Sequence, residues 1–379
     1  MDQFEELQIL NQILAIPTIN GDFNEKNLAD FISKVFSDYD IYNKVDVIKP
    51  GIANVFSEIP GYDDNHCIAV NGHLDTVPYG DLSKWDHNPA VPFVQNNCIY
   101  ARGASDMKSG LAAFVVAMCN IKKKGAQPRR TIKFLGTADE EKGGLGASYA
   151  LEQGILGNPD ILIIGEPTNG NLGIAQKGCL WIKLKFFGKT SHGAHPSKGI
   201  NALDISFELY KQIKKSVTKY FHPLLNHATA VITFAKGGIA PNMVPDYSEI
   251  MIDIRSVPTL SNQGIIEEIN LIVLDFEKRN KGLHIEIEIE NDRKSYEIDP
   301  KLIEIKKIRD TYEKVFGKTP LDIGLSYFSD SSIFAEKMPF VPILLFGPGY
   351  QDLAHQPNEF IKVSDYLSII DIYEKILLE

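Results

Sequence analysis

Several short segments of this chain place a histidine or a carboxylate directly after an apolar run. In the first, residues 71–78, the two-residue period of a strand puts His73 and Asp75 on the same side. A carboxylate in that place can hold the second imidazole nitrogen of a metal-bound histidine and fix its tautomer. Taken alone, such a pair is more often a strand-end histidine beside a turn-forming aspartate, so its meaning depends on the other segments.

Acidic residues stand at two further positions where predicted elements begin or end. Asp106 lies where small residues lead into a buried helix, and it is either a helix cap or a bridge between two cations. Glu140 and Glu141 follow a strand that ends at Thr137, and open α/β sheets build their sites at this end of a strand. An acidic run is usually solvated surface. At a site, however, one glutamate can bind a metal while its neighbour moves a proton.

Two more residues complete a set of candidate metal ligands. Glu166 follows the apolar segment 161–164, and His355 lies in a loop after Gly349. Each has an ordinary structural explanation, but five residues at strand ends and loops can converge on one edge of a sheet: His73, Asp106, Glu141, Glu166 and His355. Two imidazoles and three carboxylates, without thiolates, are ligands for a pair of zinc, cobalt or manganese ions. The set predicts a dinuclear hydrolase site.

Nucleophilic catalysis by serine or cysteine fits the sequence less well. Ser105 does not stand in a G-x-S-x-G segment, because Met107 takes the place of the last glycine. None of the four cysteines has a recognisable base motif beside it, and the sequence contains no G-x-x-x-x-G-K-[ST] phosphate loop. We therefore rank this chemistry last.

The elements that must position these residues alternate between helix and strand in the first part of the chain. Apolar residues recur at helical spacing in residues 4–15 and 25–36. There follow strands near 53–58 and 67–72, a buried helix over 107–121, a strand over 131–137, a helix over 144–153 and a strand over 161–164. This order predicts an α/β sheet with helices on its faces.

The pattern changes near residue 180, where apolar and polar residues alternate as in a half-exposed antiparallel strand. The next elements are a helix over 201–213, strands near 230–234 and 249–255, a helix over 264–276 and a strand over 284–290, the order of a split βαβ unit. After Pro300 come a helix over 302–316, a strand over 341–346 and a helix near 363–378. We predict a catalytic domain of residues 1–179 and 294–379, with an α+β domain of residues 180–293 inserted.

Length and composition favour a two-domain soluble protein. The 379 residues exceed the roughly 250–300 at which single cores stop growing. A net charge of −10 argues against a general nucleic-acid binder. The four cysteines form no C-x-x-C pair, the N-terminus lacks a signal peptide's features, and the longest apolar run, 111–119, is too short to span a membrane. We expect reduced thiols, a cytoplasmic location and no membrane insertion.

Taken together, the ordered motifs resemble those of the metallopeptidase M20 family. The matching segments are HLD at 73–75, GASDMK at 103–108, EE at 140–141, GEP at 165–167 and AHQPNE at 354–359. Within the family, they are most similar to the branch of succinyl-diaminopimelate desuccinylases and acetylornithine deacetylases. The resemblance implies a zinc-peptidase-like catalytic domain in two segments and an inserted lid domain that usually forms the contact of a homodimer.

The resemblance also implies roles for the matched residues. His73 and Glu166 would hold one divalent metal ion, Glu141 and His355 the other, and Asp106 would bridge the two ions. Asp75 would orient His73, and Glu140 would act as the general base. The peptide bond from Asp106 to Met107 is expected to be cis.

Further matches lie in the predicted inserted domain. The segment 188–196, GKTSHGAHP, makes His192 the residue expected to reach into the partner subunit's site and stabilise an oxyanion. We interpret the nearby His195 as structural. The segments GGIAPNMVP at 237–245 and DIR at 253–255 imply that Asn242 and Arg255 contact the substrate's carboxylate, the arginine through its bidentate fork.

Two departures from the family's pattern bear on the substrate. Lys177 stands where desuccinylases tend to have arginine, and it would meet a succinyl carboxylate as a point charge. Tyr327 and Phe328 stand where the family often has a glycine-rich loop, so they change the wall of a pocket.

The first functional hypothesis is a dinuclear zinc hydrolase that removes an N-acyl group from an amino acid, with N-succinyl-LL-2,6-diaminopimelate of lysine biosynthesis as the leading substrate. An acetylornithine deacetylase-like enzyme and a dipeptidase of the same family are the nearest alternatives. A catalytically silent binding protein is the alternative of another class. The intact set of Glu140, the five ligands and His192 argues against a silent protein.

Overall fold

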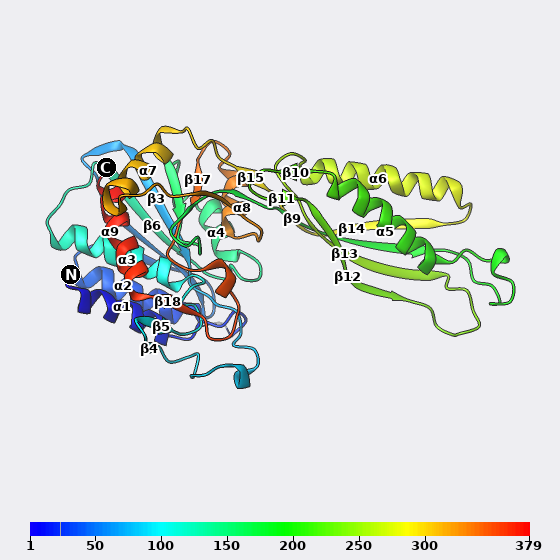
Figure 1. Cartoon of the computed structure of the whole chain (residues 1–379), viewed down its shortest axis with the longest axis horizontal. Helices are drawn as coiled ribbons and strands as arrows, with labels where there is room; N and C mark the ends of the chain where they lie inside the picture. Colours follow the sequence, from blue (N-terminus) through cyan, green and yellow to red (C-terminus); the bar gives the residue numbers. More distant parts are fainter. Residues whose placement is uncertain (23) are drawn as a thin grey trace. The chain divides into compact units, whose positions relative to one another are not determined.

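The computed structural model describes residues 1–22 and 24–379, which divide into two compact units (Figure 1). Unit 1 consists of Met1–Ile174, Ile298–Ile323 and Ser329–Glu379, and unit 2 of Ala175–Glu297 and Gly324–Phe328. The chain thus leaves unit 1 twice, for the long segment 175–297 and the short segment 324–328, and returns to unit 1 each time. The predicted fold class, an α/β unit in separate segments with an α+β unit inserted, is confirmed.

The larger sheet is mixed. Its strands lie in the order β1 (Tyr42–Lys49), β2 (Ile52–Ile59), β6 (Arg130–Thr137), β3 (Asp63–His73), β7 (Ile161–Ile164), β17 (Ile343–Leu345) and β8 (Leu172–Gln176), and β8 also pairs with β15 (Tyr296–Glu297) and β16 (Asp322–Leu325). The central strands β6, β3, β7 and β17 are parallel. The carboxyl ends of these central strands therefore meet at one edge.

The helices of unit 1 cover this sheet. Helix α3 (Lys108–Lys123) is buried over residues 108–121 and packs against α1 (Gln3–Ala15) and α9 (Val363–Leu378) (Figure 1). Helix α2 (Glu25–Asp38) packs on β1 and β2. The remaining helices of unit 1 are α4 (Leu145–Glu152), α7 (Ile303–Phe316) and α8 (Asp330–Lys337). The long apolar run of the sequence thus lies inside α3, and among the described residues no helix is long and apolar enough to cross a membrane.

A small antiparallel sheet joins distant parts of unit 1. Strand β18 (Phe360–Lys362) pairs with β5 (Cys98–Tyr100), which in turn pairs with β4 (Phe93–Gln95). The pairing sets Phe360 opposite Tyr100. It therefore brings the chain that precedes β18 beside the chain that leads into α3.

Unit 2 contains a four-stranded antiparallel sheet with two helices packed on it (Figure 1). The spatial order is β12 (Thr229–Gly237), β13 (Tyr247–Arg255), β9 (Cys179–Phe187) and β14 (His284–Arg293), with α5 (Ala202–Thr218) and α6 (Asn262–Arg279) as the helices and β10 (Phe221–His222) and β11 (Asn226–His227) as a short hairpin. Alternate residues of β9 are buried in a core with both helices. The chain order is the predicted split βαβ order.

The sequence patterns did not predict β1, β4, β5, β8, β18 or α8. Strand β1 lies at an edge of the sheet and has no buried residue, so its sequence lacks the apolar–polar alternation that predicts a strand. Strands β4, β5 and β18 have only three residues each. Helix α8 has eight residues and is mostly polar. Tertiary pairing, rather than local pattern, forms these elements.

Candidate metal centre

The edge at which the parallel strands end carries most of the predicted ligands. His73 is the last residue of β3 and pairs in register with Thr137, the last residue of β6. Glu140 and Glu141 follow Thr137 by three and four residues, and Glu166 follows β7 by two. The shared register brings these side chains to one edge because parallel strands end on the same side.

Helix α3 adds Asp106 to this edge. The helix begins two residues after Asp106 and lies so close to the end of β7 that a Cβ on Gly110 would be 2.0 Å from the carbonyl oxygen of Gly165. Only glycine fits at such an approach of two backbones. The peptide bond between Asp106 and Met107 is cis, as the family resemblance implies.

The five predicted metal ligands come together in the structure. Three overlapping groups of side chains have ligand atoms within 4.8 Å of one another: His73, Asp106 and Glu166; His73, Glu140 and Glu141; and Asp106, Glu141 and His355. They come from the ends of three strands, the start of one helix and the loop before β18. Carboxylate oxygens and imidazole nitrogens without thiolate are a suitable donor set for zinc, cobalt or manganese.

Asp106 lies between the two histidines. Its Oδ1 atom is 3.3 Å from Nε2 of His73, and its Oδ2 atom is 3.4 Å from Nε2 of His355. The same Nε2 of His355 is 3.0 Å from Oε2 of Glu141. Each oxygen of one carboxylate thus faces a different imidazole, which is the arrangement that a bridge between two cations requires.

The backbone of Asp75 fixes the tautomer of His73. Nδ1 of His73 is 2.9 Å from the carbonyl oxygen of Asp75, and because a carbonyl only accepts, the neutral ring carries its hydrogen on Nδ1. Nε2 is then left as an electron-pair donor toward the cluster. The Asp75 carboxylate is 3.7 Å from Nδ1 and accepts from the backbone N–H groups of Glu140 and Glu141 at 3.0 and 3.1 Å. Asp75 therefore positions both the histidine and the glutamate pair.

The electrostatics of the cluster fit bound cations. Burial raises the pKa of the Glu140 and Glu166 carboxyls well above their usual range, and neighbouring carboxylates raise it further. Burial lowers the pKa of His73, but Asp106 and the other carboxylates outweigh it, so the net shift is upward. Within the described chain, Oε1 of Glu141 is buried without a hydrogen-bond partner. Divalent cations would offset the repulsion between these carboxylates and give this oxygen a partner.

Sequence reasoning missed one buried pair beside the cluster. The carboxylate of Glu359 is 2.7 Å from Nη1 of Arg102, and both side chains are almost fully buried. Glu359 is part of a matched motif, but nothing in a loop sequence marks a glutamate as buried. The signal lies only in the pairing of β18 with β5, which the sequence patterns did not predict.

In unit 2, two of the predicted residues lie on adjoining loops. The backbone N–H of Gly193, next to His192, donates to the carbonyl oxygen of Asn242 at 2.7 Å. Nδ1 of His192 accepts from the backbone N–H of Ala194 at 3.0 Å, so the neutral ring carries its hydrogen on Nε2. Both His192 and Asn242 are exposed. The histidine therefore presents an N–H donor to its surroundings.

The other two predicted residues of unit 2 are engaged locally. Arg255 donates through Nε and Nη2 to the carboxylate of Asp253 at 2.8 and 3.0 Å, and its guanidinium lies 5.4 Å from the centre of the Phe328 ring. Lys177 donates to the carbonyl oxygen of His227 at 2.7 Å. Burial, and then the charge of Arg255, lower the pKa of Lys177. The bidentate fork predicted for a substrate is thus held by Asp253.

One end of the unit 2 sheet carries His192 and Asn242, and the opposite end carries Lys177 and Arg255. Arg255 closes β13, whereas Asn242 precedes the start of that strand by five residues. The nine residues of β13 span about 26 Å at the usual rise per residue. Within one chain, Asn242 and Arg255 therefore lie at opposite ends of β13.

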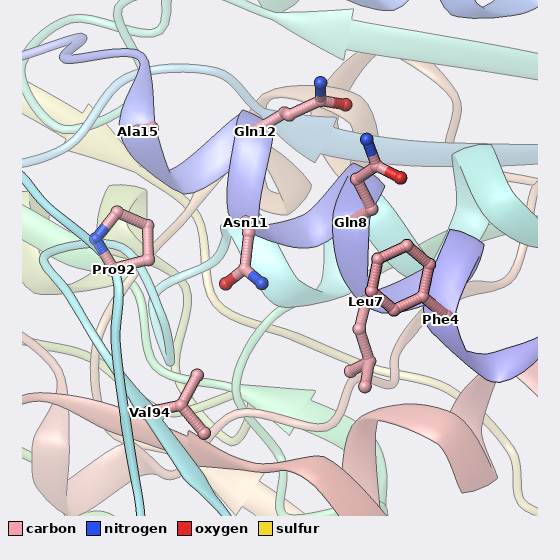
Figure 2. A pocket seen from close by; sticks show the side chains of 8 residues that line it. All are labelled: Phe4, Leu7, Gln8, Asn11, Gln12, Ala15, Pro92 and Val94. Atoms are coloured by element: carbon pink, nitrogen blue, oxygen red, sulfur yellow. The ribbon is translucent and has the colours of Figure 1, made fainter.

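A groove elsewhere in unit 1 has no features of a hydrolytic site. It has a volume of about 600 Å³ and lies between the outer face of α1 and the chain around β4 (Figure 2). Its lining is Phe4, Leu7, Gln8, Asn11, Gln12, Ala15, Pro92 and Val94. Since no lining side chain is ionisable, the carboxylate and histidine cluster remains the candidate site.

Comparison with known proteins finds a family that matches most of the chain. A model of the family described as Peptidase family M20/M25/M40 matches residues 69–379. A probable succinyl-diaminopimelate desuccinylase of Staphylococcus aureus (strain MRSA252) is 30% identical, over 98% of this chain and 96% of that protein.

Solved structures share the fold. Aminopeptidase PepT of Bacillus cereus has a TM-score of 0.82 and 21% identity, covering 100% of this chain and 98% of its own. The Bacillus subtilis YXEP protein, titled a dinuclear metal binding peptidase from the M20 family, has a TM-score of 0.76 and 16% identity, covering 99% and 97%.

Proposed function

Because the chain belongs to the M20/M25/M40 family of peptidases, we propose that it is a metal-dependent amide hydrolase that removes an N-acyl group from an amino acid. The observation that carries the proposal is the position of Asp106, whose two carboxylate oxygens face Nε2 of His73 and Nε2 of His355. A single buried carboxylate between two imidazoles is what a pair of bridged cations needs.

The proposed ligands are those predicted from the sequence. His73 and Glu166 would hold one ion, Glu141 and His355 the other, and Asp106 would bridge them. Zinc is the first choice because imidazole and carboxylate suit it, and cobalt or manganese would fit the same donors. Two bound divalent cations would supply Lewis acidity, lowering the pKa of a water molecule and polarising the amide carbonyl.

Glu140 is the proposed general base. Its carboxyl is buried beside the ligands, and its backbone is held by Asp75, so its side chain stays in one place. It would accept a proton from the attacking water and return it to the nitrogen of the leaving amine.

Residues of unit 2 are proposed to recognise the transition state and the substrate. His192, with its hydrogen on Nε2, would donate to the oxyanion of the tetrahedral intermediate. Arg255 and Asn242 would bind the amino acid's carboxylate. Because Asn242 and Arg255 lie at opposite ends of the sheet in one chain, the two residues would meet one substrate carboxylate only in a homodimer, which is the proposed assembly.

The proposed domain roles follow the sequence pattern. Residues 1–179 and 294–379 would form the catalytic domain, and residues 180–293 the lid and dimerisation domain. A cytoplasmic enzyme of amino-acid biosynthesis is the setting that this chemistry suits. Sedimentation analysis of the purified chain would test the homodimer, since a monomer at assay concentrations would contradict it.

N-succinyl-LL-2,6-diaminopimelate is the first proposed substrate. Support comes from the Staphylococcus aureus relative, named a probable succinyl-diaminopimelate desuccinylase. Lys177, beside Arg255, adds a second positive charge at that end of the sheet, as a succinyl carboxylate would require. N-acetylornithine and dipeptides are the alternatives, and peptides belong in the assay because PepT, of similar fold, is an aminopeptidase.

Amine release from each of the three substrate classes tests the proposal. The protein is stripped of metal and assayed before and after addition of zinc or cobalt, with Glu140→Gln beside it. We expect metal-dependent release from the succinyl substrate and none from the variant. Release from the acetyl substrate or a dipeptide instead would reassign the substrate class, and failure to bind metal would overturn the function.

A further inference from the structure

The carboxylate of Glu359 accepts four hydrogen bonds from the chain that leads into α3. Its Oε1 atom accepts from the backbone N–H groups of Ser105 and Asp106 at 2.7 and 2.8 Å. Its Oε2 atom accepts from the backbone N–H of Gly103 at 3.1 Å and from Nη1 of Arg102 at 2.7 Å. The side chain has no exposed surface. One carboxylate therefore fixes the backbone on which Asp106 is carried.

Arg102 connects the same carboxylate to the loop that carries His355. Its Nη1 and Nη2 atoms donate to the carbonyl oxygens of Gln356 and His355 at 3.2 and 3.4 Å. Its guanidinium also stacks 5.0 Å from the centre of the Trp85 ring. Asp106 and His355 are 249 positions apart in the chain, by subtraction of their numbers. The ion pair links these two distant segments directly.

Stability alone is a weak reason for such a pair. Removing two charges from water is costly, and apolar residues of similar volume often stabilise a core as well or better. What the pair supplies is direction, because the planar guanidinium and the carboxylate each make several bonds of fixed geometry. Those bonds end on the backbones of Asp106 and His355.

We propose that Arg102 and Glu359 are positioning residues that hold Asp106 and His355 at the spacing needed to bind two metal ions. The inference rests on the proposed metal centre, and it adds to that centre two residues that contact no metal. Without Glu359, the N–H groups of Gly103, Ser105 and Asp106 would lose their acceptor and the bridging aspartate would become mobile.

A second ion pair of unit 1, formed by a buried arginine and a partly buried glutamate, provides a control. Arg130 donates through Nη1 to Oε2 of Glu304 at 2.6 Å, and Arg130 is 5% exposed, against 4% for Arg102. The other charged partners of this pair are Asp160 beside Arg130 and Lys307 beside Glu304, and neither is a metal-ligand candidate. Glu304→Gln and Glu359→Gln therefore both remove the carboxylate charge opposite a buried arginine, although the Glu304 side chain is 15% exposed. Only Glu359 also bonds to the backbone of a metal-ligand candidate.

The test is a cobalt(II) titration of the metal-stripped full-length chain, followed by visible absorption, with thermal unfolding measured on the same samples. We expect Glu359→Gln to weaken binding of at least one cobalt ion by about 10- to 100-fold, the usual effect of losing a partner that orients a ligand. Its absorption spectrum should also change. Glu304→Gln should leave both cobalt affinity and spectrum unchanged, and its unfolding temperature shows how much stability the loss of such an ion pair costs.

Hydrogen exchange of the metal-free protein adds a readout that is independent of metal. The amides of Ser105 and Asp106 should exchange faster in Glu359→Gln than in the wild type, and at the wild-type rate in Glu304→Gln. If Glu359→Gln does not fold, Arg102→Lys replaces it, since lysine keeps the charge but cannot make all of the bonds to Glu359, Gln356 and His355.

The outcomes separate this inference from the proposed function. Wild-type binding of two cobalt ions, with equal affinity and spectrum in the folded variant at Arg102 or Glu359, overturns the positioning role and leaves the metal centre intact. Equal loss of cobalt affinity in Glu304→Gln also overturns it, because the effect would then follow stability. A wild-type chain that binds no cobalt overturns both.

Discussion

The metal cluster of unit 1 and the polar residues of unit 2 were predicted from motifs of similar length, yet the two sets are arranged differently. In unit 1, five candidate ligands from separate segments lie within reach of one another. In unit 2, His192 and Asn242 lie at one end of a sheet, and Lys177 and Arg255 at the other. Topology explains the difference, because parallel strands end on one edge whereas successive antiparallel strands end on opposite edges.

The two regions also differ in how their side chains are held. Four side chains of the cluster are buried, and their charges have few alternative partners: His73, Asp106, Glu140 and Glu166. His192, in contrast, is exposed, and Arg255 is already paired with Asp253. Substitutions in the cluster should therefore abolish activity, whereas substitutions in unit 2 should reduce it by degrees.

Removal of metal should have the largest effect. Dialysis against a chelator should abolish amide hydrolysis, and zinc or cobalt should restore it, because the cations would supply the Lewis acidity that activates water and polarises the amide carbonyl. Metal content and activity are measured on the same samples. Full activity in a sample shown to be free of metal would contradict a metal-dependent site in unit 1, and the comparison of the two regions would no longer hold.

The adjacent glutamates should separate catalysis from metal binding. Glu140→Gln should lower kcat by about 10²- to 10⁴-fold, the usual contribution of a general base, with metal content unchanged. Glu141→Gln should lower metal content instead, because the amide group cannot serve as an anionic ligand. Steady-state kinetics with metal analysis checks both variants. Loss of metal from Glu140→Gln would indicate that Glu140 is the metal ligand and Glu141 the general base.

The candidate ligands could be predicted from the sequence because each of His73, Glu141 and Glu166 lies within a few residues of a strand whose apolar run is visible. The contact of Asp75 with the glutamate pair and the contacts of Glu359 could not be predicted. Asp75 accepts from the backbone of Glu140, and Glu359 from the backbone of Asp106. Such bonds depend on loop geometry, for which a side-chain pattern carries no information.

His192 should show the largest effect within unit 2. His192→Ala should lower kcat by about 10²- to 10³-fold, as expected for loss of one oxyanion donor, with little change in KM. His195→Ala is the matched control, since its ring lies only 6.2 Å from that of His192 and should be replaceable without loss. Equal losses in both variants would indicate a structural role for this loop.

Arg255 should give the smallest effect, and one of a different kind. Arg255→Lys should raise KM about tenfold with kcat nearly unchanged, because lysine loses one of two charged hydrogen bonds to the substrate's carboxylate. Asp253→Asn should raise KM less, since the guanidinium of Arg255 is then held less firmly but is still present. The matched control is Arg279→Lys, because Arg279 also pairs with an aspartate, Asp275, and stacks on an aromatic ring. A fall in kcat rather than a rise in KM for Arg255→Lys would indicate that this arginine acts in catalysis, as His192 does. The two ends of the unit 2 sheet would then share a catalytic role, although they lie far apart in one chain.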